Sequence, residues 1–511
     1  MSQPSLTVEL PEQPLGTRIL RGALAGFAIN LAGNGFLFIG QLLIARQLSR
    51  TEYAEFTVCI SLMAILAMFA DLGMNPLITR MLAQAEEDAS RGMEDRRGSL
   101  LGTAVALRLV LSIFVALIII TIGRLFYPVS MVQNCLILLI TLLISSRVLA
   151  VRPAAESMFR SQGKYYLVAL FALFDAVAFA VLLFLGRYYT LRLQSVLWVY
   201  ALCNVPGFIL LVIALVRWIR RENVSLRLDP VLAKGFLLGS IPLCIGTIFL
   251  TIHIQIDSLL LDKLSTPFEV ASYGATMRLN AAAAPIPLVL AAVIAPELTR
   301  LLRQNDQTRS LQLTDISLRI LLVLGFFIAL LITTCSGLIV PLTLGEKYAS
   351  ASPLLIWTGW MLLPIFIGTL LMEVSVAAGQ SWFMTANAGV CMVAVIIGDL
   401  FLLRKFGATG AMVSKLIAVS LGAGLLVWLS RNSGHLDTRR FTSAFLRTGL
   451  ATIASLAASW LFMAGNFHLA IVVIVQMGIY SLVIHATNVL TAQEVLSLWR
   501  RVTKRPSAII G

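Results

Sequence analysis

The stretch TIHIQIDSLLLDKL, residues 251–264, decides the fold class of this 511-residue chain. Its apolar density is that of a buried or membrane-spanning helix, yet it carries His253 and Asp257 four residues apart, on one face of that helix. Arg278 interrupts the apolar run ASYGATMRLNAAAA in the same way. A helix that faces lipid should have only apolar side chains at these positions, so the solvent around the chain has to be settled first.

Composition identifies that solvent as lipid. Hydrophobic residues make up 59% of the chain and charged residues 13%, and the mean hydropathy is +0.90. A soluble chain of this length would need far more polar surface to cover its core. The net charge of +14 comes from short basic clusters between apolar runs, as in cytoplasmic loops that face anionic lipid. We therefore predict an integral membrane protein that contacts membrane lipid and has no nucleic-acid partner.

Runs of about 20 apolar residues, the length needed to cross a hydrocarbon core of ~30 Å, predict the membrane spans. Lys and Arg concentrate in alternate connecting loops, which predicts that both termini are cytoplasmic. No loop is long enough for a folded soluble domain. The sequence thus predicts an all-α protein with about fourteen transmembrane helices, at 22–45, 56–79, 99–123, 131–151, 166–186, 195–216, 236–261, 270–296, 320–344, 352–378, 382–403, 410–430, 442–464 and 469–491.

A weak internal repeat indicates how these helices are organised. LLIARQLSRTEYAEF (42–56) is similar to LLLDKLSTPFEVASY (259–273), and RSQGKYY around Gly163 is similar to VAAGQSWF around Gly379, both at an offset of 216 residues. Two six-helix lobes that enter the membrane from the same side would enclose a central cavity, as in transporters that work by alternating access. The predicted parts are a cytoplasmic tail, the first lobe, a basic cytoplasmic linker, the second lobe, two extra C-terminal helices and a second cytoplasmic tail, at 1–17, 18–216, 217–235, 236–430, 431–491 and 492–511.

Several motifs resemble those of a known family. IDSLLLDKL, VASYGATMRL, APELTRL, LGEKYASASPLL and FGATGAMVSK resemble the polysaccharide-repeat (Wzx-type) flippases of the multidrug/oligosaccharidyl-lipid/polysaccharide exporter superfamily. LIARQLSRTEYAEF and ADLGMNPLITR are similar to that family's first helical hairpin, so the resemblance covers roughly residues 18–430. It implies two lobes around a polar cavity, a polyprenyl-diphosphate-linked oligosaccharide as substrate, the bacterial inner membrane as location, and polysaccharide polymerases as candidate partners. The predicted number of helices, fourteen, also resembles that of the lipid II flippases, so the branch of the superfamily stays open.

Charged residues inside the predicted spans are the candidate site, because a charge at mid-bilayer normally faces a partner or a wet cavity. Asp71 and Arg108 lie at matching depth in the second and third helices, and Asp257 and Arg278 do so in the seventh and eighth. Each pair is predicted to form an ion pair, either as a fixed link between helices or as a gate that opens during transport. Asp175 lies in the middle of the fifth helix and needs a partner or a wet cavity.

Four other observations leave alternatives open. His253 beside Asp257 is read as an interhelical hydrogen bond or as a carrier of a coupling proton, because no further ligand supports a metal site. Arg147 and Lys415 lie near helix ends, where snorkelling to the interface explains them. Asn30, Asn34 and Gln41 form a polar stripe on the first helix, which either faces a cavity or bonds to a neighbouring helix. Small residues beside this stripe favour close packing, namely Gly33, Gly35 and Gly40.

The leading hypothesis is a flippase for lipid-linked oligosaccharide, whose anionic diphosphate needs cations in the cavity. Candidate substrate-binding cations are Arg278 and Arg108 first, then Arg147 and Lys415. An ion-coupled small-molecule or drug exporter is the alternative, and its cationic substrates would depend on the acidic residues Asp71, Asp175 and Asp257. A membrane glycosyltransferase is disfavoured, because no loop is rich in paired carboxylates. We expect no catalytic residue, no cofactor, no metal and no ATP site, since GxxxxGK[ST] does not occur.

Overall fold

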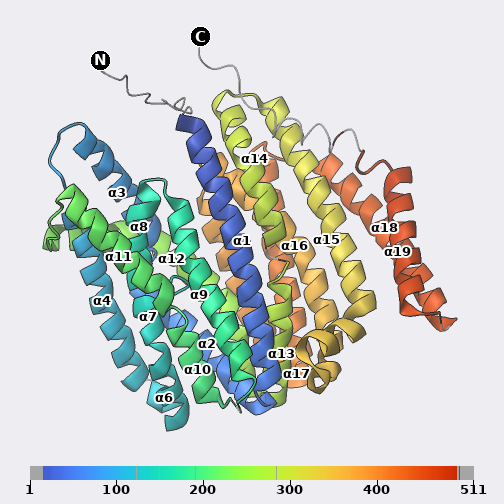
Figure 1. Ribbon diagram of the computed structural model, residues 1–511. Helices are drawn as coiled ribbons and strands as arrows, with labels where there is room; N and C mark the ends of the chain where they lie inside the picture. Colours follow the sequence, from blue (N-terminus) through green and yellow to red (C-terminus); the bar gives the residue numbers. More distant parts are fainter. Residues whose placement is uncertain are drawn as a thin grey trace, which may run out of the picture. The chain divides into compact units, whose positions relative to one another are not determined.

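The computed structural model describes residues 15–121, 123–148, 150–189, 191–283, 285–465, 467–491 and 494. The predicted cytoplasmic tails, 1–17 and 492–511, fall largely outside these ranges. Every element of regular structure in the described residues is helical, which confirms an all-α protein (Figure 1). The elements are α1 (Leu15–Gln47), α2 (Arg50–Asp71), α3 (Met74–Ser90), α4 (Arg97–Thr121), α5 (Gly123–Phe126), α6 (Val129–Leu138), α7 (Ile140–Ile144), α8 (Val151–Ser161), α9 (Tyr165–Gly186), α10 (Leu193–Leu202), α11 (Val205–Glu222), α12 (Pro230–Leu264), α13 (Pro267–Asn280), α14 (Pro285–Arg303), α15 (Gln307–Leu344), the 3-10 helix η1 (Glu346–Ala351), α16 (Ser352–Ala377), α17 (Trp382–Asn432), α18 (Thr438–Ala464) and α19 (Leu469–Ala486).

The chain forms two compact units. The first contains the described residues up to Gly40 together with Phe69–Gly186 and Leu197–Ile241. The second contains Gln41–Met68, Arg187–Val196 and the described residues from Pro242 onward. Helices α1, α2, α10 and α12 each continue from one unit into the other. These boundaries differ from those of the predicted lobes, 18–216 and 236–430, and the predicted division stays a prediction.

Twelve helical segments within the described residues are long and apolar enough to cross a membrane. The predicted spans 382–403 and 410–430 both lie in α17, which consists of two helical segments separated at Gly407, where φ is 51°. Ser414 Oγ of the second segment donates to Val395 O of the first at 3.1 Å, so the two segments pack against each other. The predicted span 131–151 is interrupted, because α7 ends at Ile144 and α8 begins only at Val151. The chain is therefore a multi-pass membrane protein, and the count of fourteen spans stays a prediction.

The two copies of the predicted repeat share one type of helix ending. A glycine with positive φ follows each of α8 and α16, Gly163 at 71° and Gly379 at 76°. After α8, Gly163 N donates to Arg160 O at 3.0 Å and Lys164 N donates to Phe159 O at 2.9 Å. The corresponding distances around Gly379 are 3.0 and 2.8 Å. This paired bonding is the Schellman ending of a helix, which needs a left-handed residue and so favours glycine. The same bonds at an offset of 216 residues support the repeat.

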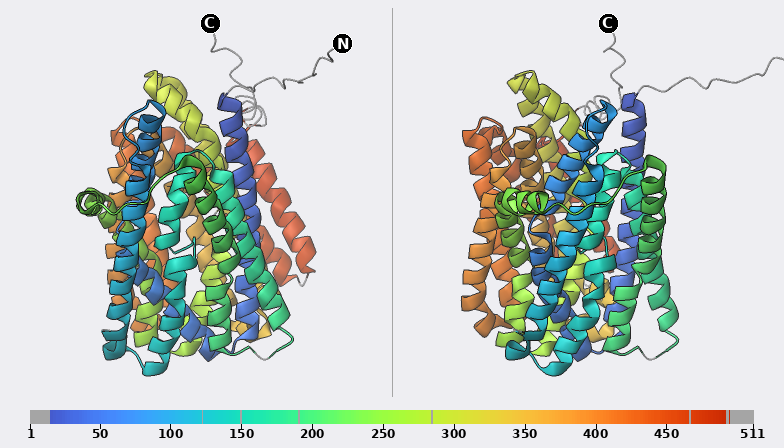
Figure 2. Two further views of the ribbon diagram at one scale, coloured as in Figure 1. Left: turned by 60° about the vertical axis from the view of Figure 1, so that its left-hand side comes forward. Right: turned by 90° about the vertical axis from the view of Figure 1, so that its left-hand side faces the viewer.

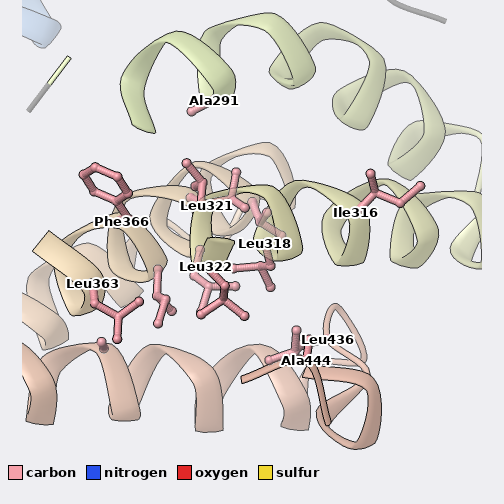
Figure 3. Packing of buried hydrophobic residues seen from close by; sticks show 14 of the residues in the cluster. Ala291, Ile316, Leu318, Leu321, Leu322, Leu363, Phe366, Leu436 and Ala444 are labelled. Atoms are coloured by element: carbon pink, nitrogen blue, oxygen red, sulfur yellow. The ribbon is translucent and has the colours of Figure 1, made fainter. Parts of the chain in front are cut away.

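Each unit has its own apolar core. In the first unit, apolar side chains of α3, α4 and α8 pack together, among them Met74, Ile78, Leu101 and Met158. In the second unit, leucine and phenylalanine side chains of α15 and α16 pack together, with Ala291 of α14 and Ala444 of α18 beside them (Figure 3). Helices α18 and α19 lie side by side as a hairpin (Figures 1 and 2). The cores hold these helices in fixed registers, and the buried polar groups described next lie within that frame.

Candidate functional site

Two predicted spans are interrupted helices, and both interruptions lie in the first unit. The predicted span 56–79 is divided between α2 and α3 at Leu72 and Gly73, whose φ angles are 47° and 68°. The predicted span 131–151 is divided between α7 and α8, and the described residues between them, 145–148 and 150, are not helical. Interrupting a helix frees backbone N–H and C=O groups, and away from water these groups need other hydrogen-bond partners.

Arg108 of α4 satisfies groups at both interruptions. Its Nη2 donates to Asp71 Oδ1 at 2.6 Å, at the end of α2, and its Nη1 donates to the carbonyl oxygen of Ala150, just before α8. Asp71 Oδ2 in turn accepts a bond from Gly73 N at 3.2 Å. The predicted Asp71–Arg108 pair is thus confirmed. Both side chains are buried, Arg108 completely, and Arg108 is not among the residues that line the cavities described below.

Arg152 of α8 occupies the middle of a second buried network. Its Nη1 donates to Ile144 O at 2.8 Å, the freed end of α7, and to Asp175 Oδ2 on α9 at 2.7 Å. Its Nε donates to Glu156 Oε1 at 2.9 Å, and Glu156 Oε2 accepts from Arg160 Nη2 at 2.9 Å. Asp175 therefore has the partner that its position in the fifth predicted helix required.

Helix α11 closes this network on a third side. Gly207 N donates to Asp175 Oδ1 at 2.8 Å. A Cβ at position 207 would lie 2.2 Å from Phe171 O and 2.5 Å from Asp175 Oδ1, so only glycine fits. Figure 1 shows α8, α9 and α11 as neighbours in this unit. The carboxylate of Asp175 is held by a guanidinium and by the backbone of a neighbouring helix.

A cavity of about 380 Å³ opens beside these interrupted helices. Polar residues of α1, of 145–148, of α8 and of α9 line it: Asn30, Asn34, Ser146, Arg147, Glu156, Arg160 and Tyr165. A second cavity of about 420 Å³ is lined by α3 residues, including Arg80, and also by Arg160 and Tyr165. Arg160 and Tyr165 therefore lie at both cavities.

The polar stripe on α1 is positioned by close helix packing. A Cβ on Gly33 would lie 3.8 Å from Leu173 of α9, and one on Gly40 would lie 2.4 Å from the Phe179 ring. The predicted close packing is confirmed at these two glycines, whereas nothing lies within 4 Å of a Cβ on Gly35. Asn30 and Asn34 line the cavity, which agrees with the prediction of a cavity-facing stripe. Gln41 is not among the lining residues.

Arg147 is a cavity cation that forms no ion pair with a carboxylate among the described residues. Its guanidinium carbon lies 5.5 Å from the centroid of the Phe179 ring, a cation–π contact. Among the described residues, its Nη2 is buried without a hydrogen-bond partner. Arg147 follows the end of α7 and lines the cavity, and the snorkelling expected for it stays a prediction. The ionisable lining residues Arg147, Glu156 and Arg160 carry a formal charge of +1.

The structure corrects two predictions in the second unit. Asp257 Oδ2 pairs with Lys415 Nζ, so Arg278 was the wrong partner for Asp257. Lys415 is only 4% exposed and does not snorkel to the interface. Arg278 is half-buried beside the buried Tyr53 hydroxyl and forms no ion pair within the described part of the chain. The pairing differs because, after the break at Gly407, the second segment of α17 brings Lys415 to α12.

His253 lies one turn before Asp257 on α12. Its backbone carbonyl accepts from Lys415 Nζ at 2.5 Å, while its Nδ1 is buried without a partner among the described residues. In that part of the chain, no three His, Cys, Asp or Glu side chains gather closely enough to hold a metal ion. The structure leaves the proton-carrying and hydrogen-bonding interpretations of His253 both open.

Comparison with known proteins places this fold. A family model described as polysaccharide biosynthesis protein matches residues 19–302, more than half of the chain. The chain belongs to this family. The fold is similar to that of the lipid II flippase MurJ in an inward closed conformation, with a TM-score of 0.68, 14% identity, and coverage of 95% of this chain and 100% of that one.

Two further solved structures share the fold of this polysaccharide biosynthesis protein. One is an inward-facing multidrug resistance MATE family transporter of the MOP superfamily, with a TM-score of 0.62, 13% identity, and coverage of 81% and 98% of the two chains. The other is a mutant of the Vibrio cholerae MATE transporter VcmN, with a TM-score of 0.53 and 15% identity. That comparison covers 82% of this chain and 96% of the other. No curated protein matches the sequence. The chain is thus a multi-pass membrane protein of the polysaccharide biosynthesis family, with a fold similar to that of these flippases and transporters.

The sequence prediction missed the most highly connected residues of this family member. Arg152, Glu156 and Arg160 were assigned to a loop, because the apolar run before them has the length of a full span. Their spacing of four residues places all three on one face of a helix, and that pattern was the available signal. Pro153 was a second signal, since proline is tolerated in the first turn of a helix and here marks the start of α8.

Proposed function

We propose that this protein is a flippase that moves polyprenyl-diphosphate-linked oligosaccharide units across the bacterial inner membrane, by alternating access, for surface polysaccharide synthesis. The observation that carries the proposal is the cavity of the first unit, which is lined by the cations Arg147 and Arg160 and by the amides of Asn30 and Asn34. Its volume of about 380 Å³ lies within the ~300 to 1,000 Å³ of small-molecule sites.

The chemistry of the substrate matches that of the cavity. A diphosphate that leaves water needs its negative charge compensated, and arginine binds phosphate oxygens through paired hydrogen bonds. Arg147 is the best placed residue, because it lines the cavity and forms no ion pair among the described residues, whereas Arg160 pairs with Glu156. Asn30 and Asn34 offer amide donors and acceptors to sugar hydroxyls. Arg80 adds a positive charge at the adjacent cavity, which shares Arg160 with the first.

The other candidate cations rank lower on this evidence. Arg108 and Lys415 are committed to buried ion pairs with Asp71 and Asp257, so we assign both to holding helices together. Arg278 has no such partner among the described residues and stays a candidate for substrate contact in the second unit. The ranking of cavity cations is therefore Arg147 first and Arg278 second.

The alternatives differ in substrate charge or in head group. A drug exporter for cations would use free carboxylates, but Asp71, Asp175 and Asp257 each pair with a basic side chain. Glu156 at the cavity is likewise bonded to two arginines. A lipid II flippase would present the same diphosphate chemistry, so only the glycan distinguishes it from our proposal.

Deleting the gene and identifying the polyprenyl-linked glycans that accumulate tests the proposal. We expect one oligosaccharide repeat unit to accumulate on the cytoplasmic face while surface polysaccharide falls, with both effects reversed by the intact gene. Accumulation of lipid II with normal surface polysaccharide would favour the alternative. Unchanged amounts of both would remove the proposal.

A further inference from the structure

One glutamate in each copy of the predicted repeat has no role in the proposed function. Glu52 lies in the copy at 42–56, and Glu269 lies in the copy at 259–273. Each is the third residue of a helix, Glu52 in α2 and Glu269 in α13. The surroundings of these two carboxyl groups can therefore be compared directly.

Both glutamates take part in the N-terminal cap of their own helix. Glu52 N donates to Ser49 Oγ at 3.2 Å, and Ser49 N donates back to Glu52 Oε2 at 3.0 Å. This reciprocal pair is a capping box, in which a Ser or Thr bonds to a Glu or Gln three positions on. In the other copy, Glu269 N donates to Thr266 Oγ1 at 3.4 Å. The two glutamates thus occupy the same position in the same kind of helix start.

Each glutamate also reaches the start of a helix far away in the sequence. Leu193 N donates to Glu52 Oε1 at 3.3 Å, and Leu193 is the first residue of α10. Ala408 N donates to Glu269 Oε2, and Ala408 is the first residue of the second segment of α17, directly after Gly407. The two contacts span 141 and 139 residues of chain. All of these residues lie in the second unit.

A carboxylate is well suited to this position. The first N–H groups of a helix have no acceptor within the helix, and the helix dipole favours a negative charge there. Hydrogen bonds to an ionised group are also stronger than those between neutral groups. A Cβ on Gly407 would lie 2.2 Å from Glu269 Oε2 and 2.6 Å from its Cδ. Glycine is therefore needed at 407 for the approach of the carboxylate as well as for the positive φ.

We propose that Glu52 and Glu269 are equivalent anchoring residues, each of which holds the N-terminus of the last helix of its predicted repeat against the second helix. Glu52 anchors α10, where the sixth predicted span begins, and Glu269 anchors the second segment of α17, which is the twelfth. Each anchor joins two helices of one repeat at the predicted periplasmic side, so that these ends move as a pair. This inference does not depend on which substrate the protein moves.

Hydrogen–deuterium exchange tests both anchors on the purified full-length protein in lipid nanodiscs, with no transported substrate. Glu52→Asp and Glu269→Asp keep the negative charge in the first turn of their own helix, but the shorter side chain cannot reach the second helix start. We expect Glu52→Asp to raise exchange at the Leu193 amide about tenfold or more and to leave the Ala408 amide unchanged. Glu269→Asp should do the reverse.

Two further sets of variants keep the result decisive. The matched control is Glu297→Asp, because Glu297 bonds to Arg300 of its own helix at 2.6 Å and should alter neither amide. Glu52→Gln and Glu269→Gln keep the side-chain length and one carbonyl acceptor. They should therefore raise exchange at the same amides by less than the Asp variants, and they test the same contacts if an Asp variant does not fold.

The site-selective pattern is what the proposal requires. Unchanged exchange at both amides in the Asp and Gln variants would overturn it, because the carboxylates would then hold nothing. A rise at both amides with either single variant would also overturn it, since that result indicates general loosening. A selective rise at only one of the two amides would overturn the equivalence of the two anchors. Because no substrate is present, failure of the proposed transport function leaves each outcome unaffected.

Discussion

Arg108 donates to Asp71 Oδ1 at 2.6 Å and to the carbonyl oxygen of Ala150, so one guanidinium connects the ends of two interrupted helices. Asp71 is the last residue of α2, and Ala150 immediately precedes α8. The Arg108 guanidinium thus supplies hydrogen-bond donors at helix ends, where the backbone hydrogen bonds of the helix are interrupted. In the described state the Asp71–Arg108 pair links helices. The sequence had predicted either such a link or a gate that opens during transport.

Removing this link should destabilise the first unit. Arg108→Ala leaves the Asp71 carboxylate buried and unpaired, and breaking a buried pair in this way costs ~3–5 kcal/mol. Asp71→Ala should have a similar effect, and the double variant should cost less than the sum of the two, because neither partner is then left alone. Unfolding of the purified protein in detergent measures all three.

The control for that series is Arg309→Ala, whose side chain is 69% exposed and should change stability by no more than about 0.5 kcal/mol. Equal effects of Arg108→Ala and Arg309→Ala would contradict the role of Arg108.

Gly207→Ala tests the contact between α11 and the Asp175 network. The added methyl group would meet Phe171 O and Asp175 Oδ1 at 2.2 and 2.5 Å, so we expect a loss of ~1–3 kcal/mol from overpacking. Gly449→Ala is the matched control, because nothing lies within 4 Å of a Cβ there. That variant should be neutral or slightly stabilising, since alanine is the better helix former. Identical behaviour of the two variants would argue against the close approach.

Double-mutant cycles distinguish the two partners considered for Asp257. Asp257→Asn and Lys415→Met should interact strongly, with a coupling of ~0.5–3 kcal/mol, because the side chains are in contact. Asp257→Asn and Arg278→Gln should be additive. The reverse pattern would restore the partner predicted from depth alone.

The sequence was sufficient for features that depend on local patterns. Long apolar runs predicted the helices, the spacing of Asn30 and Asn34 predicted a polar face on α1, and Gly163 and Gly379 marked matching helix ends. The Asp71–Arg108 pair followed from depth, because it joins helices that are close along the chain. In these cases the periodicity of the helix carries the information.

Features that depend on irregular geometry could not be predicted in this way. Depth matching offered Arg278 as a partner for Asp257, whereas Lys415 reaches it from a helical segment 158 residues away that follows the break at Gly407. The role of Arg152 depends on the interruption between α7 and α8, which lies within an apolar run that reads as one continuous span. A break of that kind becomes visible only when the backbone is traced.

Reporter fusions test the predicted topology, and the two terminal fusion sites lie outside the described residues. Fusions at residue 5, within 217–235 and after Arg505 should all report the cytoplasm, because Lys and Arg concentrate in the loops predicted on that side, 217–235 among them. A periplasmic signal from 217–235 would contradict two lobes entering the membrane from the same side.

The central claim is that the cavity of the first unit holds the anionic head group of a lipid-linked oligosaccharide, with Arg147 as its main contact. The most direct measurement is surface polysaccharide in a deletion strain complemented with Arg147→Gln, Arg147→Lys or the exposed control Arg309→Gln, at matched expression. We predict that Arg309→Gln restores full polysaccharide, Arg147→Lys restores part, and Arg147→Gln loses most while lipid-linked oligosaccharide accumulates on the cytoplasmic face. Full restoration by well-expressed Arg147→Gln would contradict the claim.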